Sequence, residues 1–264
     1  MAKLRQIAKD TVEMLEQPGT SVSQLLQYAV ENTVLFTPAE LETLLQSITP
    51  AHAFETAFEV TNETTLDAAR RLAVYGEAVA LNFASAKNPG GGFLRGASAQ
   101  EESIARASGL YPCLLKAGDY YRFHRNLDTC LYSDHMIYSP SVPVFKHENG
   151  TMMDTVLPLS IITSAAVNAG VVIRNEPHKK ALIESTMRVR IHKLLAIMVA
   201  KEHRIVILGA WGCGVFQNDP AMIARLFYEA LTGKFANCFQ RVVFAVKTNQ
   251  EKMIEPFELL FTKQ

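Results

Sequence analysis

The chain has 264 residues with 26 basic and 26 acidic side chains, and hydrophobic residues make up 48% of it. This length can bury a substantial core, either as one large α/β domain or as a domain with an extension. Because the formal net charge is zero, composition gives no support for coating nucleic acid or binding an anionic membrane, and the charged N-terminus has no apolar run long enough for a signal peptide or a membrane span.

The four cysteines are scattered along the chain without a C-x-x-C pair. This pattern is typical of neither a disulfide framework nor a zinc site, and it fits a reducing compartment. We therefore expect a cytoplasmic protein without a metal or a cofactor. A monomer is expected, with no membrane partner and no direct binding of nucleic acid.

Residues 1–52 are predicted to form a helical extension that precedes the main domain, residues 53–264. Apolar residues at helical spacing predict a first helix over 4–15, which Pro18 and Gly19 end. A second short helix is predicted over 24–30. A third begins at Thr37, where Glu40 completes a capping box and Pro38 takes the first helical position.

From about residue 56 the pattern changes to alternating strands and helices. Buried strands are predicted at 58–60, 78–84, 204–208 and 241–246, with one or two more between 130 and 145. Helices are predicted at 64–75, 98–117, 179–200 and 219–231, and Gly233 should end the last of them. Strands that are apolar on both faces and alternate with helices predict a three-layer α/β/α sandwich.

The stretch from Asn88 to Glu102 contains three consecutive glycines and, seven residues later, Gln100 followed by two glutamates. Glycines 90–92 leave a bare backbone on whose N–H groups a ligand can lie. Adjacent carboxylates at the start of a predicted helix suit an anionic substrate that needs a proton. Acidic residues are common in first helical turns for electrostatic reasons alone. The two glutamates are therefore interpreted as catalytic only because the three glycines precede them.

A second glycine-rich segment, Gly209 to Pro220, follows the predicted strand at 204–208 and leads into a capped helix. Open α/β sheets bind ligands at the carboxyl ends of their strands, where glycines allow a phosphate to approach. The segment is not a Walker A loop, because no Gly-Lys-Ser/Thr follows, and it is not the dinucleotide fingerprint, because Gln217 replaces the third glycine. A tight turn between strand and helix is the alternative.

Together these two segments resemble the signature of poly(ADP-ribose) glycohydrolases of the microbial type, which are built on a macrodomain. The resemblance extends over roughly residues 50–250 and includes the stretches around Leu81–Ala84 and Ser108–Tyr111. It implies a macrodomain-like sandwich with a mixed sheet, and ADP-ribose or poly(ADP-ribose), free or attached to protein, as ligand and substrate.

The resemblance also implies roles for individual residues. Glu102 would protonate the leaving 2′-hydroxyl oxygen and then activate water, while Glu101 and Asn88 would hold the distal ribose. The expected substrate-binding residues are Asn88, Gly90, Gly91, Gly92, Phe93, Gln100, Gly209, Ala210, Gly212, Cys213, Gly214, Val215 and Phe216, with glycines 212 and 214, Cys213 and Val215 around the diphosphate and Phe216 on the distal ribose. Asn62 and Glu63 are candidates for the adenine end.

The adjacent Glu101 and the dianionic substrate diphosphate would both raise the pKa of Glu102, so that it keeps a proton near neutral pH. Cleavage from chain ends is expected, with the N-terminal helices and the loop 93–99 covering one side of the cleft. The alternatives are a module that binds ADP-ribose without turning it over, a hydrolase of single ADP-ribose units, and a domain for another phosphate ligand. Trp211 and Cys213 are expected to be packing residues.

Overall fold

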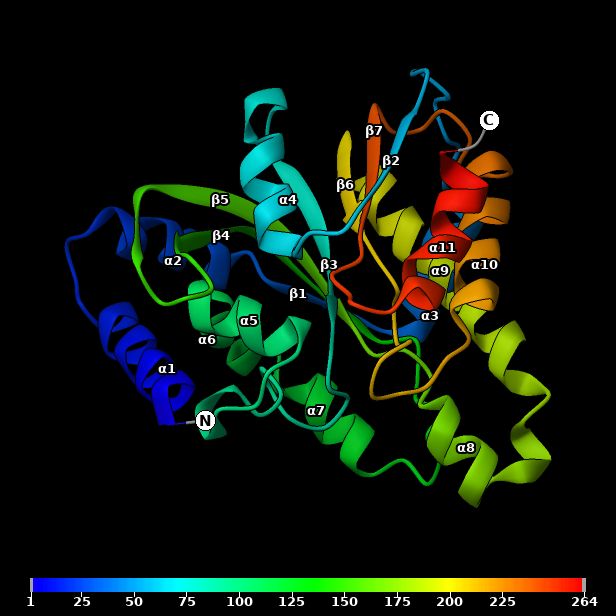
Figure 1. The fold of residues 1–264 in the computed structure, drawn as a ribbon, viewed down its shortest axis with the longest axis horizontal. Helices are drawn as coiled ribbons and strands as arrows, with labels where there is room; N and C mark the ends of the chain where they lie inside the picture. Colours follow the sequence, from blue (N-terminus) through cyan, green and yellow to red (C-terminus); the bar gives the residue numbers. More distant parts are fainter. Residues whose placement is uncertain (1, 263–264) are drawn as a thin grey trace.

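The computed structural model describes residues 2–262 (Figure 1). The first third contains α1 (Ala2–Leu15), α2 (Ser21–Glu31), β1 (Val34–Phe36), α3 (Pro38–Ser47), β2 (Ala57–Thr61), α4 (Thr65–Leu72) and β3 (Ala78–Phe83). The middle contains α5 (Gln100–Ala107), α6 (Leu110–Lys116), α7 (Gly118–Arg125), β4 (Met136–Lys146), β5 (Met152–Ser164) and α8 (Ala169–Asn175). The last third contains α9 (Leu182–Ala200), β6 (Ile205–Leu208), α10 (Pro220–Thr232), β7 (Arg241–Ala245) and α11 (Glu251–Phe261).

One mixed sheet has the strand order β1-β4-β5-β3-β6-β7-β2. Strand β4 is antiparallel to both of its neighbours, whereas the pairs from β5 across to β2 are all parallel. Strands β5, β3, β6, β7 and β2 therefore end at the same edge. Loops that follow these five strands are brought together there, although they are far apart in the sequence.

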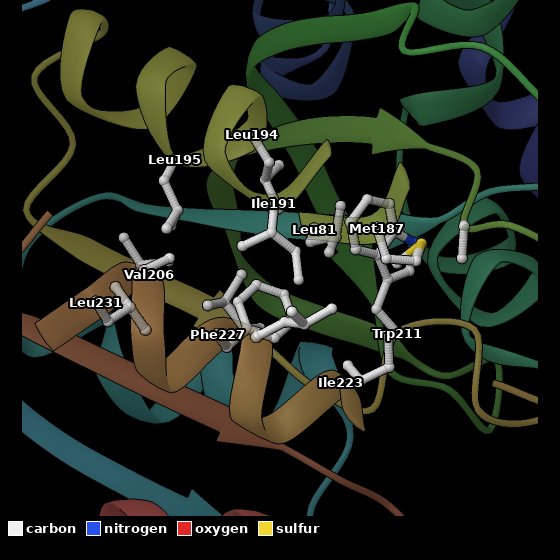
Figure 2. Close-up of a cluster of buried hydrophobic side chains, with 14 of the residues drawn as sticks. Leu81, Met187, Ile191, Leu194, Leu195, Val206, Trp211, Ile223, Phe227 and Leu231 are labelled. Atoms are coloured by element: carbon white, nitrogen blue, oxygen red, sulfur yellow. The ribbon is translucent and has the colours of Figure 1, made fainter. Parts of the chain in front are cut away.

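Alternate side chains of the central strands enter two different hydrophobic clusters. Leu81 of β3 belongs to a cluster with Ile191 of α9 and Phe227 of α10 (Figure 2). Its neighbour Ala80 belongs to a second cluster, to which α2, α4, α5, α6 and α7 contribute. Helices thus cover both faces of the sheet, and the predicted three-layer α/β/α sandwich with a mixed sheet is confirmed.

Local signals in the sequence explain where several helices begin. Thr37 and Glu40 form the predicted capping box before α3, because each side chain accepts a hydrogen bond from the other's backbone N–H. Asp219 accepts a hydrogen bond from the N–H of Ala221 and caps α10, with Pro220 at the first helical position. Thr64 caps α4 in the same way.

The predicted helix over 98–117 is wrong as a single element. It is two helices, α5 and α6, which are separated at Ser108 and Gly109. Ser108 is extended and forms a β-bridge with Val144, and the N–H of Gly109 donates to the carbonyl of Pro143 at 2.9 Å. Contact with β4 therefore replaces the helical hydrogen bonds that local propensity would favour.

Other differences come from elements that the sequence pattern did not predict, among them β1, β5 and α11. Strand β5 contains Pro158, which usually argues against a strand, and it pairs with Pro143 of β4 beside a register shift. Strand β4 begins at Met136, so the first residues of the predicted 130–145 strand region form a loop. The boundary after residue 52 stays a prediction, although β1 from the N-terminal segment pairs with β4.

Candidate active site

A cavity of about 630 Å³ lies at the edge where the five strands end. Its lining comes mainly from the segments that follow all five parallel strands, with Ala166 after β5, and from the first turns of α5. Those segments contribute Glu63 and Thr64 after β2, Ser85, Asn88, Gly91, Gly92 and Arg95 after β3, Ala210–Phe216 except Cys213 after β6, and Lys247 and Thr248 after β7. The two glycine-rich segments are therefore neighbours around one cavity, as predicted.

The first glycine segment bends tightly around the side chain of Glu102. Gly90 and Gly91 have positive φ angles of 67° and 62°, and the N–H of Gly91 donates to the carbonyl of Asn88 at 3.0 Å. A Cβ atom on Gly91 would overlap with a carboxylate oxygen of Glu102. Glycine is thus required at this position both for the backbone conformation and for the close approach of the acid.

Glu102 is half-buried and borders the cavity from the first turn of α5. Its Oε1 accepts a hydrogen bond of 2.9 Å from the N–H of Gly92. This bond occupies one oxygen of the carboxyl group and fixes its orientation. The second oxygen has no hydrogen-bond donor among residues 2–262, so it is available to a ligand.

Glu101 has a different environment, although it is the adjacent residue. Only 3% of it is exposed, its Oε2 accepts from the N–H of Ser85 at 2.7 Å, and its Oε1 lies 3.4 Å from Nδ2 of Asn82. Burial raises the pKa of Glu101 to about 8; the Ser85 hydrogen bond opposes this shift, and the charge of Glu102 adds to it. Near neutral pH, Glu101 is therefore mostly protonated in the free protein.

Gln100 connects α5 to the end of β3. Its Oε1 accepts from the N–H of Phe83 at 2.8 Å, and its Nε2 donates to the carbonyl of Leu81 at 2.7 Å. The side-chain amide thus accepts from one backbone group of β3 and donates to another, as a neighbouring strand would. Gln100 also borders the cavity, but both ends of its amide are already used in these hydrogen bonds, which join the first residue of α5 to β3.

The second glycine segment is a compact loop held by its own backbone and by the loop after β5. Nδ2 of Asn218 donates to the carbonyls of Val167 and Gly212 at 2.7 and 3.1 Å. The N–H of Cys213 donates to the carbonyl of Ala210 at 3.1 Å. Among residues 2–262, no acceptor lies within hydrogen-bond range of the backbone N–H groups of Gly212, Gly214, Val215 and Phe216. Four donors are thus available to a ligand.

Four of the expected binding residues do not line the cavity. They are Gly90, Phe93, Gly209 and Cys213. Phe93 packs its ring against Tyr111, with 4.9 Å between ring centroids, and Gly209 lies so close to the Ala245 carbonyl that a Cβ would be 2.6 Å from that oxygen. Cys213 is buried, and burial raises the pKa of its thiol. The backbone N–H of Cys213 forms a hydrogen bond within the loop. Trp211 joins the loop to the end of β5, because its Nε1 donates to the carbonyl of Ser164.

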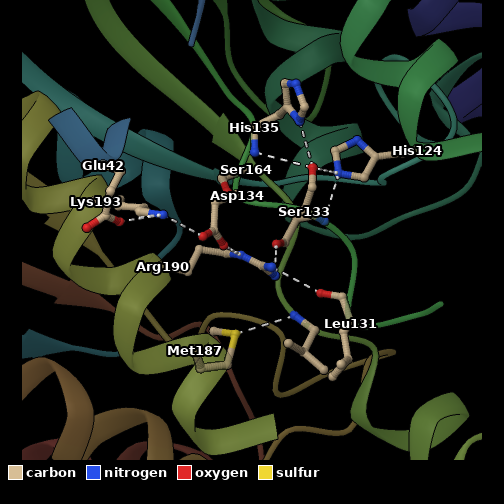
Figure 3. A network of polar contacts seen from close by, with 12 residues as sticks. Glu42, His124, Leu131, Ser133, Asp134, His135, Ser164, Met187, Arg190 and Lys193 are labelled. Carbon is tan, nitrogen blue, oxygen red and sulfur yellow. Dashed lines mark hydrogen bonds and ion pairs between the residues drawn. The ribbon is translucent and has the colours of Figure 1, made fainter. Parts of the chain in front are cut away.

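A buried polar network supports the loop that follows β5 (Figure 3). The guanidinium of Arg190 on α9 donates to Asp134 at 2.9 Å and to the carbonyls of Leu131 and Ala165 at 3.0 Å each. Lys193 also bonds to Asp134 at 2.9 Å. Although burial alone would raise it, the two cations hold the pKa of Asp134 below its ordinary value. The network fixes residue 165, next to Ala166 in the cavity wall.

Several lining residues were not predicted as site residues, namely Arg95, Glu148, Lys247, Thr248 and Met253. Lys247 and Thr248 could have been found, because they directly follow a predicted strand. Glu63, a candidate for the adenine end, does line the cavity. Asn62 does not; its side chain exchanges two hydrogen bonds with the backbone of Thr248, at 2.7 and 3.1 Å.

The fold and the cavity define an α/β enzyme with a carboxylate pair beside a glycine-lined cleft. The sequence model of the family described as microbial-type PARG, catalytic domain, matches residues 3–147. Poly(ADP-ribose) glycohydrolase from Thermomonospora curvata is similar at 40% identity with a TM-score of 0.91, over 99% of this chain and 100% of that chain. The chain therefore belongs to the family of microbial-type poly(ADP-ribose) glycohydrolases.

Two further solved structures contain ligands. Poly(ADP-ribose) glycohydrolase from Deinococcus radiodurans in complex with ADP-ribose is 41% identical with a TM-score of 0.84, over 92% of this chain and 97% of that chain. The Thermomonospora curvata enzyme bound to the inhibitor ADP-HPD is 41% identical with a TM-score of 0.87, over 98% and 99% of the two chains. No curated protein matches the chain.

Proposed function

We propose that this protein hydrolyses the ribose–ribose O-glycosidic bond of poly(ADP-ribose) from chain ends and releases ADP-ribose. The observation that carries the proposal is the position of the Glu102 carboxyl group in the cleft, fixed by the Gly92 N–H. Family membership and the ADP-ribose complex of a relative that is 41% identical support the substrate.

Glu102 acts first as an acid and then as a base. Its free oxygen carries a proton to the 2′-hydroxyl oxygen of the leaving unit as the bond to the anomeric carbon of the distal ribose breaks. The resulting carboxylate takes a proton from water, whose oxygen bonds to the same anomeric carbon. Glu102 is protonated again at the end, and the products are ADP-ribose and a chain shortened by one unit.

The surrounding groups bind the ADP-ribose that is released. The four free N–H groups of the 209–218 loop suit the two phosphates, because backbone donors in a glycine loop form a concave anion site. The diphosphate in turn stabilises the positive charge that develops at the anomeric carbon. Asn88 and the buried Glu101 hold the distal ribose, Phe216 packs against it, and the adenine lies toward Glu63 and Thr248.

The proposed setting is the cytoplasm, and the proposed fold family is the macrodomain. All four cysteines are unpaired, which supports a reducing compartment. Among residues 2–262, no helix has both the length and the apolar character needed to cross a membrane. The monomeric state and the absence of nucleic-acid binding stay predictions.

Comparison of the wild-type protein with Glu102→Gln on labelled poly(ADP-ribose) tests the function. Thin-layer chromatography should identify ADP-ribose as the product, and the variant should turn over at least about a hundredfold more slowly, as expected for loss of a general acid–base. The side-chain amide oxygen that this substitution introduces can still accept the Gly92 hydrogen bond, so calorimetry should show retained ADP-ribose binding.

Each alternative gives a different result in the same experiment. A wild-type protein that binds ADP-ribose but releases none would be a binding module. Activity confined to mono-ADP-ribosylated protein would indicate a hydrolase of single units. Near-normal turnover by Glu102→Gln, measured when chemistry limits the rate, would show that another residue is the catalytic acid.

A further inference from the structure

Four basic side chains lie on or beside the loop of residues 85–97, which contains glycines 90–92. Lys87 and Arg95 belong to the loop, and Arg5 and Arg125 contact it. Arg5 of α1 donates from Nε to the carbonyl of Arg95 at 2.9 Å. On the other side of the loop, Arg125 at the end of α7 donates to the carbonyl of Lys87 at 2.8 Å. Arg5, Arg95 and Arg125 are exposed and Lys87 is half-buried. Figure 1 shows the start of α1 beside the turn after β3.

None of these four cations has a carboxylate partner within ion-pair distance among residues 2–262. Some other arginines of the chain do have carboxylate partners. Arg188 and Arg225, for example, each pair with both Glu184 and Glu229 on the outer face of α9 and α10. Although the whole chain has no net charge, unneutralised positive charge therefore gathers around the catalytic loop.

Arg95 lies at the catalytic end of the cavity. Its Nη2 is 3.9 Å from the point where a Cβ on Gly92 would be, and Oε1 of Glu102 is 3.8 Å from the same point. The guanidinium borders the cavity and makes no hydrogen bond to any residue among 2–262. An unpaired guanidinium so close to the proposed acid can reach a group that is attached to the leaving oxygen.

We propose that Arg95, extended by Arg5, Lys87 and Arg125, binds the diphosphate of the ADP-ribose unit on the leaving side of the bond that is cut. This inference rests on the proposed function, because that function places the leaving oxygen beside Glu102. The rest of the polymer is joined through this oxygen and must pass the loop 85–97. Each unit carries a diphosphate, and arginine binds phosphate oxygens with paired, charge-assisted hydrogen bonds.

Steady-state kinetics of Arg95→Gln on long poly(ADP-ribose) tests the proposal. The KM should rise by about three- to tenfold at low salt, with kcat little changed, and the increase should shrink as salt screens the charges. Arg95→Lys keeps the charge but loses the paired hydrogen bonds, so its KM should fall between those of the wild type and Arg95→Gln. The double variant Arg5→Gln/Arg95→Gln should show a larger KM and a weaker dependence of log KM on log salt.

Two comparisons separate this proposal from others. ADP-ribose affinity, measured by calorimetry, should be the same in Arg95→Gln and the wild type, because free ADP-ribose has no leaving unit. Arg204→Gln, which removes an exposed charge before β6 at the opposite edge of the sheet, should leave the KM for polymer unchanged.

An unchanged KM for Arg95→Gln, or an equal loss of affinity for free ADP-ribose, would overturn the assignment of this subsite. Both results leave wild-type turnover intact. Failure of the proposed function would instead show as a wild-type protein that does not cleave polymer, so the two failures are distinguishable.

Discussion

Glu101 and Glu102 are adjacent on the first turn of α5, yet they have opposite environments. Successive side chains of a helix point about 100° apart, so one carboxyl group faces the end of β3 and the other faces the cleft. The buried Glu101 has a raised pKa and is mostly neutral at pH 7.

The raised pKa of Glu101 predicts a pH dependence of stability. Its pKa is about 8 in the folded protein, against 4.5 for an unperturbed glutamate. Between these values the folded state binds a proton that the unfolded chain has released, so this contribution is complete below about pH 4.5 and is lost as pH rises toward 8.

Glu101→Gln removes this titration. Its free energy of unfolding relative to the wild type should therefore increase by up to a few kcal/mol between pH 5 and pH 8.5, as measured by urea denaturation at constant salt. A difference between the two proteins that stays constant across this range would contradict a raised pKa for Glu101.

At the scale of the element, two of the three glycines in the loop 209–218 have different functions. Gly212 has a φ of 73°, and a Cβ there would be 2.5 Å from that of Ala166 and 2.6 Å from Nδ2 of Asn218. A Cβ on Gly214 would meet nothing within 4 Å, because this residue borders the open cavity. Gly212 is thus needed for the fold of the loop, whereas Gly214 only leaves open space at the cavity.

Replacing each glycine by valine should separate these functions. Gly214→Val should fold with an unchanged Tm but bind ADP-ribose about 2–3 kcal/mol more weakly, roughly a hundredfold, because the side chain would occupy the phosphate space. Gly212→Val should lower stability by about 1–3 kcal/mol through strain and overlap. Calorimetry and thermal unfolding measure the two effects. Unchanged affinity in a folded Gly214→Val would place the ligand elsewhere.

The same loop shows what could be predicted from the sequence. Its place after a buried strand and before a capped helix fixed its position at the carboxyl edge of the sheet, and so brought it to the Asn88–Glu102 segment. The hydrogen bonds that join Gln100 to β3 and Asn218 to Val167 are contacts between segments far apart in the sequence, which a local pattern does not predict. Such contacts also divide the predicted 98–117 helix and allow Pro158 into a strand.

At the scale of the molecule, the N-terminal helix is part of the support of the site. Ala8 of α1 packs with Phe93 and Ala105 in a separate small cluster. The hydroxyl of Thr11 donates to the carbonyl of Arg106 on α5 at 2.5 Å, and Nζ of Lys146 donates to that hydroxyl at 2.9 Å. Helix α1 thus holds both the loop 93–99 and the helix that carries the glutamates.

The structure at the two ends of the cleft bears on where polymer is cut. At the end toward β2 and β7, Asn62 and Thr248 are joined by two hydrogen bonds. At the catalytic end, Arg95, Ser98 and Ala99 are exposed. An internal cut requires that polymer continue past both ends of the bound ADP-ribose, whereas a terminal cut requires only the catalytic end to be open.

We therefore predict cleavage from chain ends on size-selected polymer. A gel time course should show free ADP-ribose from the first time points and a slow, uniform shortening of the long chains, because each turnover removes one unit at a terminus. Mid-length oligomers should be scarce early in the reaction. Their rapid accumulation before much ADP-ribose is released would contradict the prediction and show that the chain can pass the end of the cleft toward β2 and β7.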